Sequence, residues 1–362
     1  MKIDFANLQY QHDLYKKEIE DAILKVARNC NFIMGEEVVD LEDALQKFTD
    51  AKYAISCSSG TDALLLAMMA LGIEAGDEVI TTPFTFIATA ETIALVGATP
   101  VFVDIDEKTY NIDPIKIEAA LTSKTKAIIP VSLYGQPCDM DEIMTIAKKH
   151  NIKVIIDGAQ SFGSTYKGKS DSNLGDISCT SFFPAKPLGC YGDGGAVFTN
   201  DEELSNKIKS LRIHGQTKRY YHKYIGMGGR LDTIQAAVLN IKLKYYKKDL
   251  ALRQEVASKY TNLLSSKEDV VLPFIKEDRT SAFAQYSLRV KNRDEMQEKL
   301  QNLGIPTAVH YPLPLHLQEC FSYLGYKNED FPISEAVANE IMSLPMNPYL
   351  SDEEIEHIVK SL

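Results

Sequence analysis

Short apolar runs alternate with helical patterns between about residues 50 and 200, and this alternation constrains the fold more than any other feature. The apolar runs are typical of strands and span residues 78–83, 99–105, 125–132 and 153–157. The helical patterns between them span residues 61–72, 86–98 and 141–151. Near-continuous apolar strands separated by helices predict an α/β domain with a mixed, mostly parallel sheet covered on both faces. Ligands of such domains gather at the carboxyl ends of the strands.

Further patterns flank this block on both sides. An amphipathic helix is expected at 14–29 and a long charged helix at 231–264. The rest of the chain predicts a small α+β domain, with a strand and two helices at 281–292, 293–305 and 351–362. We therefore expect a large N-terminal domain over 1–245 and a small C-terminal domain over 246–362.

Charge and composition exclude several classes of function. The 50 acidic residues outnumber the 39 basic ones and give a net charge of −11, which disfavours binding to nucleic acid or to an anionic membrane. No apolar segment resembles a signal peptide or a membrane span, so a cytoplasmic protein is expected. The six cysteines form no CxxC pair, and we expect neither a metal site nor a disulfide framework.

A group of small polar residues stands directly before the apolar helical pattern at 61–72. Gly60 allows a ligand to approach the backbone, and Thr61 and Asp62 offer amides at the helix N-terminus, where the helix dipole favours an anion. A phosphate fits this arrangement. The alternative is that Ser58 or Ser59 only caps the helix.

A carboxylate ends the apolar run at 153–157. Asp157 is followed by small residues and then by Gln160, so its side chain is expected at the sheet edge where ligands bind. The alternative is an aspartate that turns the chain or caps the next helix.

One lysine, Lys186, lies in an unusual turn, FFPAKPLGCYGDGG, at 182–195. Pro184 and Pro187 restrict the backbone on either side of it, and four glycines permit tight turns. A surface loop that happens to contain a lysine rarely has so many apolar neighbours. An apolar setting lowers the pKa of a lysine and frees its amine to act as a nucleophile.

These features together predict a site for pyridoxal phosphate. The amides before the helix and Ser181 would bind the phosphate, Asp157 would bind the pyridine nitrogen, and Lys186 would form the Schiff base. Phe86 is the candidate to stack on the ring. Each signal is weak alone, but one cofactor requires all of them.

Six segments, in chain order, resemble the DegT/DnrJ/EryC1/StrS family of nucleotide-sugar aminotransferases: SGTDAL, PFTFIATA, IIDGAQSFG, SFFPAKPLGCYGDGGA, GRLDTIQAA and TAVHYPLPLHLQ. The resemblance covers nearly the whole chain. It implies the fold-type I architecture of pyridoxal phosphate aminotransferases and a homodimer whose active sites lie at the subunit interface. It also implies L-glutamate as the amino donor, with 2-oxoglutarate as its product.

The resemblance assigns roles that agree with the residue-level interpretation. Lys186 matches the Schiff-base lysine, Asp157 the partner of the pyridinium, and Gln160 the side chain beside the ring. Ser181 and the amides of residues 60–62 match the phosphate site, and Phe86 matches the stacking aromatic. One position departs, because many relatives have an asparagine that reaches the partner subunit's phosphate where this chain has Gly228.

The C-terminal half resembles enzymes that aminate carbon 3 of UDP-2-acetamido-2-deoxy-3-oxo-glucuronate for bacterial surface polysaccharides such as O-antigen. This likeness implies sugar contacts from Arg230, His310 and Tyr311, and a guanidinium suits a carboxylate or a phosphate. All three residues also have structural alternatives. A dTDP-3-oxo-6-deoxyhexose 3-aminotransferase is the alternative function. A dehydrating lyase of this fold usually has histidine in place of Lys186, and a regulator would not need the cofactor site.

Overall fold

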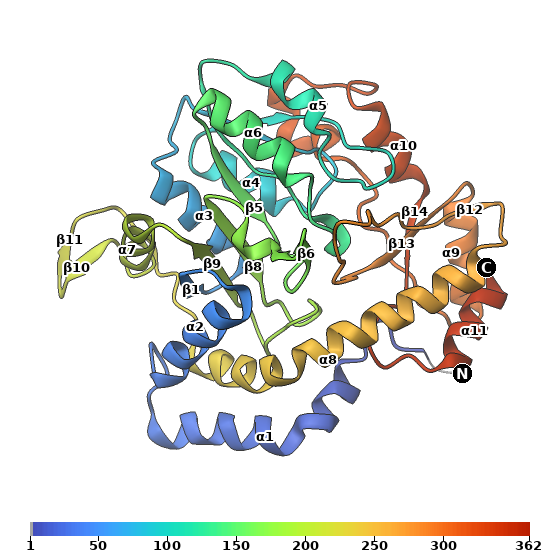
Figure 1. The fold of residues 1–362 in the computed structure, drawn as a ribbon, viewed down its shortest axis with the longest axis horizontal. Helices are drawn as coiled ribbons and strands as arrows, with labels where there is room; N and C mark the ends of the chain where they lie inside the picture. The colour runs from blue at the N-terminus through green and yellow to red at the C-terminus, as the bar shows by residue number, and fades with distance from the viewer. Residues whose placement is uncertain (1–2) are drawn as a thin grey trace.

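The computed structural model describes residues 3–362, and a seven-stranded sheet forms its centre (Figure 1). The strand order is β1-β9-β8-β5-β4-β2-β3. Only β9 runs antiparallel to its neighbours, β1 and β8. The bounds are β1 Tyr53–Cys57, β2 Glu78–Thr81, β3 Thr99–Phe102, β4 Thr125–Ile128, β5 Lys153–Asp157, β8 Ile177–Ser181 and β9 Gly195–Thr199. The predicted mixed, mostly parallel sheet is confirmed, although three of the four predicted strands end a few residues early.

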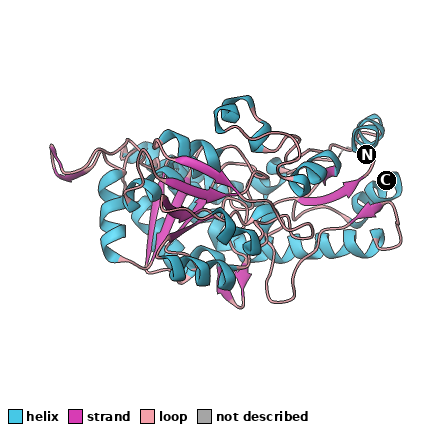
Figure 2. Ribbon diagram, turned by 90° about the horizontal axis from the view of Figure 1, so that it is seen from above, coloured by secondary structure: helices cyan, strands magenta, loops and turns pink. Residues whose placement is uncertain are grey.

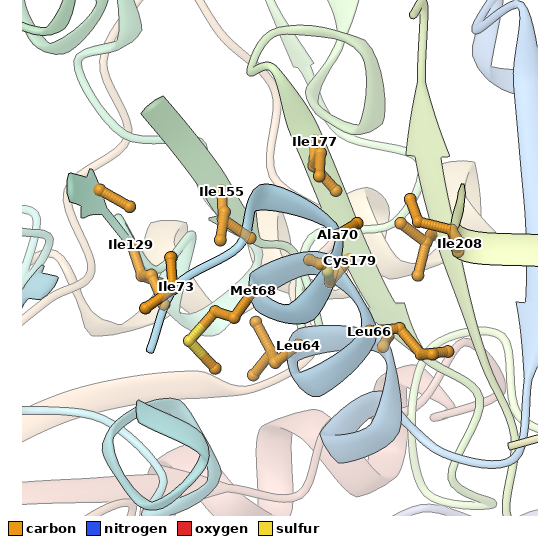
Figure 3. Packing of buried hydrophobic residues seen from close by; sticks show 14 of the residues in the cluster. Leu64, Leu66, Met68, Ala70, Ile73, Ile129, Ile155, Ile177, Cys179 and Ile208 are labelled. Carbon is orange, nitrogen blue, oxygen red and sulfur yellow. The ribbon is translucent and has the colours of Figure 1, made fainter. Parts of the chain in front are cut away.

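Helices cover both faces of this sheet, as the near-continuous apolar strands predict. On one face, α3 (Gly60–Leu71), α4 (Ala88–Leu95) and α7 (Glu202–Leu211) bury their apolar residues against the strands. Figure 3 shows Leu64, Leu66 and Met68 of α3 packed toward Ile155 and Cys179 of the sheet. The helices that cover the other face are α2 (Glu36–Thr49), α5 (Pro114–Ile117), α6 (Met140–His150) and the first half of α8 (Thr233–Leu264).

The long helix α8 connects the central sheet with the C-terminal part of the chain, and α1 (Leu8–Asn29) runs beside it (Figure 1). Both helices confirm expectations from the sequence. The rings of Tyr15 and Tyr245 stack at 4.1 Å between them. A hairpin of β10 (Gln216–Lys218) and β11 (Tyr221–His222) projects from the molecule beyond α7 (Figures 1 and 2).

The C-terminal part is a three-stranded antiparallel sheet with helices packed on it. The strands are β12 (Val270–Val271), β13 (Tyr286–Val290) and β14 (Ile341–Leu344), and the helices are α9 (Arg293–Asn302), α10 (Pro332–Glu340) and α11 (Asp352–Ser361). Ser351 and Glu354 form a capping box at the start of α11, which explains why the expected C-terminal helix begins there. The strand expected at 281–292 is shorter. The amides of residues 282 and 284 donate hydrogen bonds to the carbonyls of Gly135 and Tyr134 instead of to a neighbouring strand.

The predicted boundary between residues 245 and 246 falls inside α8, which continues through it. Residues near the N-terminus pack with the C-terminal part: Ile3 is buried in its apolar cluster, and the Met346 amide donates to the Phe5 carbonyl at 3.1 Å. The division into 1–245 and 246–362 stays a prediction.

The remaining elements of the described chain are short. They are the hairpin of β6 (Thr165–Tyr166) and β7 (Lys169–Ser170) and the 3-10 helices at Glu118–Ala120, Leu133–Gly135 (η2), Asp171–Asn173, Leu315–Leu317 and Glu319–Leu324. Across residues 3–362, none of the helices combines the length and apolar character needed to cross a membrane.

Candidate active site

A cavity of about 510 Å³ opens at the carboxyl ends of the central strands. Its wall brings together nine of the eleven candidate residues, although they are spread over 250 positions of the chain: Gly60, Thr61, Phe86, Asp157, Gln160, Ser181, Lys186, His310 and Tyr311. Asp62 and Arg230 do not line it. The cavity therefore lies at the sheet edge where the alternation of strands and helices predicts a ligand site.

Asp157 is the last residue of β5 and is buried beneath the cavity. Thr89 Oγ1 donates to its Oδ2 at 2.8 Å, and the Ala159 amide donates to its Oδ1 at 3.2 Å. Burial raises the pKa of Asp157 above the usual aspartate range, while the two donors and the charge of Lys186 oppose that shift. The carboxylate is therefore held firmly but lacks a full cationic partner, which a protonated ring nitrogen would supply.

Lys186 lies in a turn that is closed by backbone hydrogen bonds. Its own amide donates to the Phe183 carbonyl at 2.8 Å, and the Phe182 amide donates to the Gly194 carbonyl at 2.7 Å. Burial lowers the pKa of the Lys186 ammonium, while the charge of Asp157 opposes the change. A lysine of this kind releases its proton more readily than an exposed one and becomes nucleophilic.

Two side chains of α8 form hydrogen bonds with the backbone of the same turn. Lys242 is buried, and its Nζ donates to the Gly189 carbonyl at 2.5 Å. Gln235 Oε1 accepts a hydrogen bond from the Tyr191 amide at 2.8 Å. The position of Lys186 is thus set by a rigid helix as well as by the prolines and glycines of the turn.

The N-terminus of α3 meets Ser181 at the cavity wall. A Cβ atom on Gly60 would lie 2.7 Å from the Ser181 Cβ, so only glycine leaves the approach between them open. Ser59 caps the helix, and its Oγ accepts the Asp62 amide at 3.0 Å. That amide is therefore already bonded to Ser59, as the capping alternative predicts. Gly60 and Thr61 line the cavity, so the cap leaves room for the predicted anion site.

The opposite wall carries aromatic and amide groups. Phe86 is 53% exposed, and its ring lies 5.9 Å from that of Tyr311. Gln160 Nε2 donates to the Tyr311 hydroxyl at 3.2 Å, and its Oε1 accepts the Tyr134 amide at 2.7 Å. The exposed face of Phe86 is available to a flat ring in the cavity.

His310 precedes Tyr311 and is held by two contacts. Its Nδ1 lies 2.9 Å from Ser343 Oγ, and its carbonyl accepts a hydrogen bond from the Tyr134 hydroxyl. Burial, together with the charge of Lys186, lowers the pKa of His310 to about 4. The imidazole is therefore neutral at pH 7 and acts as a hydrogen-bonding group rather than as a cation.

Arg230 lies outside the cavity, just before α8, and is half-buried. Gly228, the position that departs from the family pattern, is exposed beside it. A Cβ atom on Gly228 would lie 3.3 Å from Nε2 of His214 and 3.8 Å from the Arg230 guanidinium. The His214 imidazole thus lies next to the space that a side chain at position 228 would enter.

The sequence interpretation missed four residues of the site. Thr89 binds Asp157, Tyr134 joins Gln160 to His310, and Asp193 and Gln285 line the cavity. Thr89 could have been found, because it lies one helical turn after Phe86 in the same motif. No signal in the sequence distinguishes the other three.

The residues present fit pyridoxal phosphate. The space that a Cβ on Gly60 would fill, bounded by a helix N-terminus and Ser181, suits the phosphate. A buried carboxylate at one strand end suits a protonated ring nitrogen, and a lysine with a lowered pKa lines the same cavity.

Comparisons with known proteins agree with this chemistry. The chain is 51% identical over 360 residues to the UDP-2-acetamido-2-deoxy-3-oxo-D-glucuronate aminotransferase of Pseudomonas aeruginosa, covering 99% of both chains. It is 46% identical to a pleiotropic regulatory protein of Geobacillus stearothermophilus, covering 100% of this chain and 98% of that one. The fold matches an aminotransferase crystal structure from Brucella abortus with a TM-score of 0.96 and 40% identity, over 99% of this chain and 98% of the other.

The fold-type I architecture expected from the resemblance is therefore confirmed, and the enzyme uses pyridoxal phosphate to transfer an amino group to a sugar. A profile of the DegT/DnrJ/EryC1/StrS aminotransferase family matches residues 13–362. The chain belongs to the DegT/DnrJ/EryC1/StrS aminotransferase family.

Proposed function

We propose that this enzyme transfers the amino group of L-glutamate to carbon 3 of UDP-2-acetamido-2-deoxy-3-oxo-glucuronate. The observation that carries the proposal is the 51% identity to an aminotransferase named for this sugar, which extends over 99% of both chains. The product would serve bacterial surface polysaccharides such as O-antigen, and the enzyme would work in the cytoplasm.

The roles of the site residues belong to the same proposal. Gly60 and Thr61 amides and the Ser181 hydroxyl bind the cofactor phosphate, with Asp62 holding the end of α3 through its bond to Ser59. Phe86 covers one face of the ring, and Gln160 lies beside it. Together these groups fix the orientation of the ring before substrate binds.

When bound, pyridoxal phosphate supplies a ring that withdraws electrons from the substrate carbon bearing nitrogen. The Asp157 carboxylate would keep the ring nitrogen protonated. A positive charge at that nitrogen would in turn lower the pKa of Asp157, which burial raises. Lys186, whose pKa burial lowers, would carry a proton between the substrate carbon and the cofactor: away from the carbon in the half-reaction with glutamate, and back to the carbon in the half-reaction with the keto sugar. His310 and Tyr311 would contact the sugar from the cavity wall, whereas the expected contact from Arg230 has no such support, because Arg230 does not line this cavity.

We also propose a homodimer with shared active sites. Several aromatic and aliphatic side chains are exposed on the hairpin region: Tyr220 at 77%, Tyr221 at 65% and Ile225 at 91%. Exposed apolar groups on a projecting element favour a protein interface. Light scattering should then give twice the 40.4 kDa mass of one chain, and a monomer at micromolar concentration would contradict the dimer.

The sugar is tested in the reverse direction with the cofactor-loaded enzyme. UDP-2-acetamido-3-amino-uronate should convert the bound cofactor to pyridoxamine, which is followed by absorbance, and Lys186→Ala should abolish the conversion. Conversion by dTDP-3-amino-6-deoxyhexose alone would refute the proposed sugar. Conversion by neither sugar, in a protein that also fails to use glutamate, would favour a regulator like the Geobacillus stearothermophilus relative.

A further inference from the structure

Gln285 lines the cavity, but neither the sequence motifs nor the proposed mechanism assigns it a function. It lies directly before β13, and its side chain lines the cavity together with His310, Tyr311 and Lys186. Its Oε1 is shielded from solvent and has no hydrogen-bond partner. Among residues 3–362, eight side chains carry such an atom, and only Gln285 lines this cavity.

The shielded amide oxygen of Gln285 has no partner, which is unfavourable for the protein alone, although the side chain as a whole is only partly buried. Leaving a buried acceptor without a partner costs about 1–3 kcal/mol, and most buried polar atoms are therefore bonded. A carboxamide can also turn about its last bond, so either its oxygen or its nitrogen can face the cavity. A ligand group that bonds this amide would remove the cost.

The backbone around Gln285 is fixed on both sides. The Ala284 amide donates to the Tyr134 carbonyl at 3.0 Å, and the Ala282 amide donates to the Gly135 carbonyl at 3.0 Å. On the other side, Tyr286 pairs with Leu344 in the small sheet. Gln285 is therefore held where the C-terminal part joins η2 of the large part.

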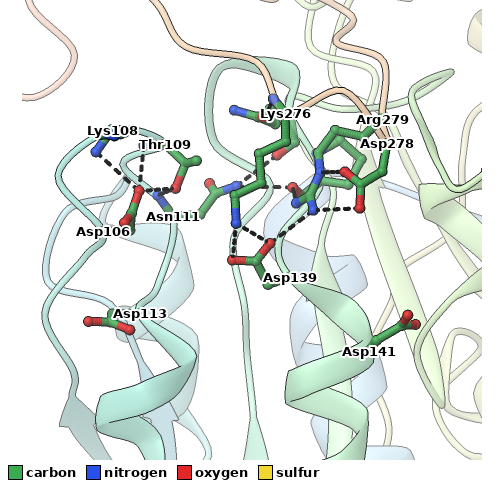
Figure 4. Close-up of polar contacts among 12 residues, drawn as sticks. Asp106, Lys108, Thr109, Asn111, Asp113, Asp139, Asp141, Lys276, Asp278 and Arg279 are labelled. Atoms are coloured by element: carbon green, nitrogen blue, oxygen red, sulfur yellow. Dashed lines mark hydrogen bonds and ion pairs between the residues drawn. The ribbon is translucent and has the colours of Figure 1, made fainter.

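Ion pairs fasten the preceding segment to the large part as well (Figure 4). Asp139 accepts from Lys276 Nζ at 2.7 and 2.8 Å and from the Arg279 guanidinium at 2.9 Å. Gln136 adds two contacts, since its Oε1 accepts the Lys276 amide and its Nε2 donates to the Phe274 carbonyl, both at 2.9 Å. The wall that carries Gln285 is rigid, which is what a substrate contact requires.

The chemistry of the amide favours the sugar over the amino donor. Glutamate carries two carboxylates, and charged partners bind these more strongly than a neutral amide does. A sugar presents hydroxyl and acetamido groups, which are neutral and match a side chain with both donor and acceptor atoms. Gln285 also lines the same cavity as His310 and Tyr311, the expected sugar contacts.

We propose that the Gln285 carboxamide binds a neutral polar substituent of the sugar ring and so helps the enzyme to distinguish its sugar substrate. This inference rests on the proposed function, because it requires that a nucleotide sugar enters the cavity. The bond would be made with the sugar and not with glutamate.

The test compares Gln285→Met and Gln285→Glu with the wild-type, cofactor-loaded enzyme. Methionine keeps the length of the side chain without its amide, and glutamate keeps an acceptor but loses the amide donors. Gln301→Leu, on an exposed position of α9, is the control. The probe is UDP-2-acetamido-2-deoxy-glucuronate, whose 3-hydroxyl prevents transamination, and calorimetry measures its affinity.

Of the two Gln285 variants, Gln285→Met removes every hydrogen-bonding atom and should bind this probe about tenfold more weakly, which corresponds to one lost hydrogen bond, whereas Gln285→Glu keeps the acceptor and should lose less. Their single-turnover rates with glutamate should stay within about twofold of the wild-type rate, and Gln301→Leu should change neither quantity. Unchanged probe affinity, or an equal loss with glutamate, would overturn the inference. If Gln285→Met does not fold, Gln285→Leu, which also removes the amide, is measured in its place.

An error in the proposed sugar substrate can be distinguished from an error in the role of Gln285. If the wild-type enzyme does not bind the UDP-linked probe but binds a dTDP-6-deoxyhexose, the proposed substrate is wrong. The same variants are then measured with the dTDP sugar. A loss of about tenfold supports the role of Gln285, and no loss refutes it.

Discussion

The approach between Gly60 and Ser181 allows one prediction to be worked out from geometry. A Cβ on residue 60 would lie 2.7 Å from the Ser181 Cβ and 3.2 Å from its Oγ, whereas carbon atoms normally approach to about 3.5–4.0 Å. Gly60 lies outside the left-handed region of the backbone, so alanine meets no conformational penalty there. The contact with Ser181 is the whole steric cost of Gly60→Ala.

Two opposing terms set the stability of the cofactor-free variant. Forcing an extra methyl group into a packed site costs about 1–3 kcal/mol. Replacing glycine by alanine within a helix returns about 0.5–1 kcal/mol. The free energy of unfolding should therefore fall by about 0–2.5 kcal/mol, and the protein should still fold.

The affinity for pyridoxal phosphate should suffer more. Relief of the contact moves the N-terminus of α3 away from Ser181, and a hydrogen bond to a charged group contributes about 1.5–3 kcal/mol. The dissociation constant of the cofactor should rise by roughly ten- to a hundredfold. Titration of the cofactor-free enzyme, followed by absorbance, measures this change.

A double-mutant cycle identifies the cause. Ser181→Gly removes the Cβ that clashes, so the double variant should recover at least about 1 kcal/mol relative to the sum of the single changes. Ser181→Ala is the matched control, since it removes the hydroxyl but keeps the Cβ. Wild-type affinity in Gly60→Ala, or additive effects in the cycle, would refute the reasoning.

Three further predictions follow from buried charges. Lys186→Ala should abolish the visible absorbance of the bound cofactor and slow transamination about a thousandfold or more, with the exposed Lys244→Ala unchanged in both assays. Burial raises the pKa of Asp171 to about 6. Between about pH 4 and 6 the folded state therefore binds more protons than the unfolded state, and the free energy of unfolding falls as the pH rises through that window. Asp171→Asn should therefore be more stable than wild type in urea at pH 8, by at most about 3 kcal/mol, and equal to it at pH 4; the same difference at both values would contradict this. Glu42→Ala leaves the buried Arg212, which is 2.5 Å from Glu42, without its counter-ion and should cost about 3–5 kcal/mol in urea denaturation, whereas a loss below 1 kcal/mol would contradict the buried pair.

The sequence predicted the structure correctly where the position of a residue depends on its near neighbours in the chain. Asp157 ends an apolar strand, and the strand end fixes its place at the sheet edge. The prolines and glycines around Lys186 indicate a held turn, and the closed turn is present. The capping residues of the last helix also identify its start.

Residues that act across long sequence distances could not be found in this way. Lys242 reaches Gly189 across 53 positions, and Tyr134 reaches His310 across 176 positions. Their positions depend on how helices and sheets pack, and no local pattern encodes that packing. Gln285 is hidden for the same reason, since its surroundings come from three distant segments.

At Gly228 the sequence departs from the family motif. This departure predicts that a side chain is missing there, but it does not predict which residue lies next to the space. At Gly228 the neighbour is His214, which comes from the segment after α7, in the left-handed region with a φ of 63°. Because a Cβ on residue 228 would lie 3.2 Å from the imidazole Cε1, a larger side chain at 228 requires this ring to move. The glycine and the histidine are therefore sterically coupled: the resemblance predicts only that an amide is missing at 228, whereas the fold shows that the His214 imidazole lies within van der Waals reach of that position.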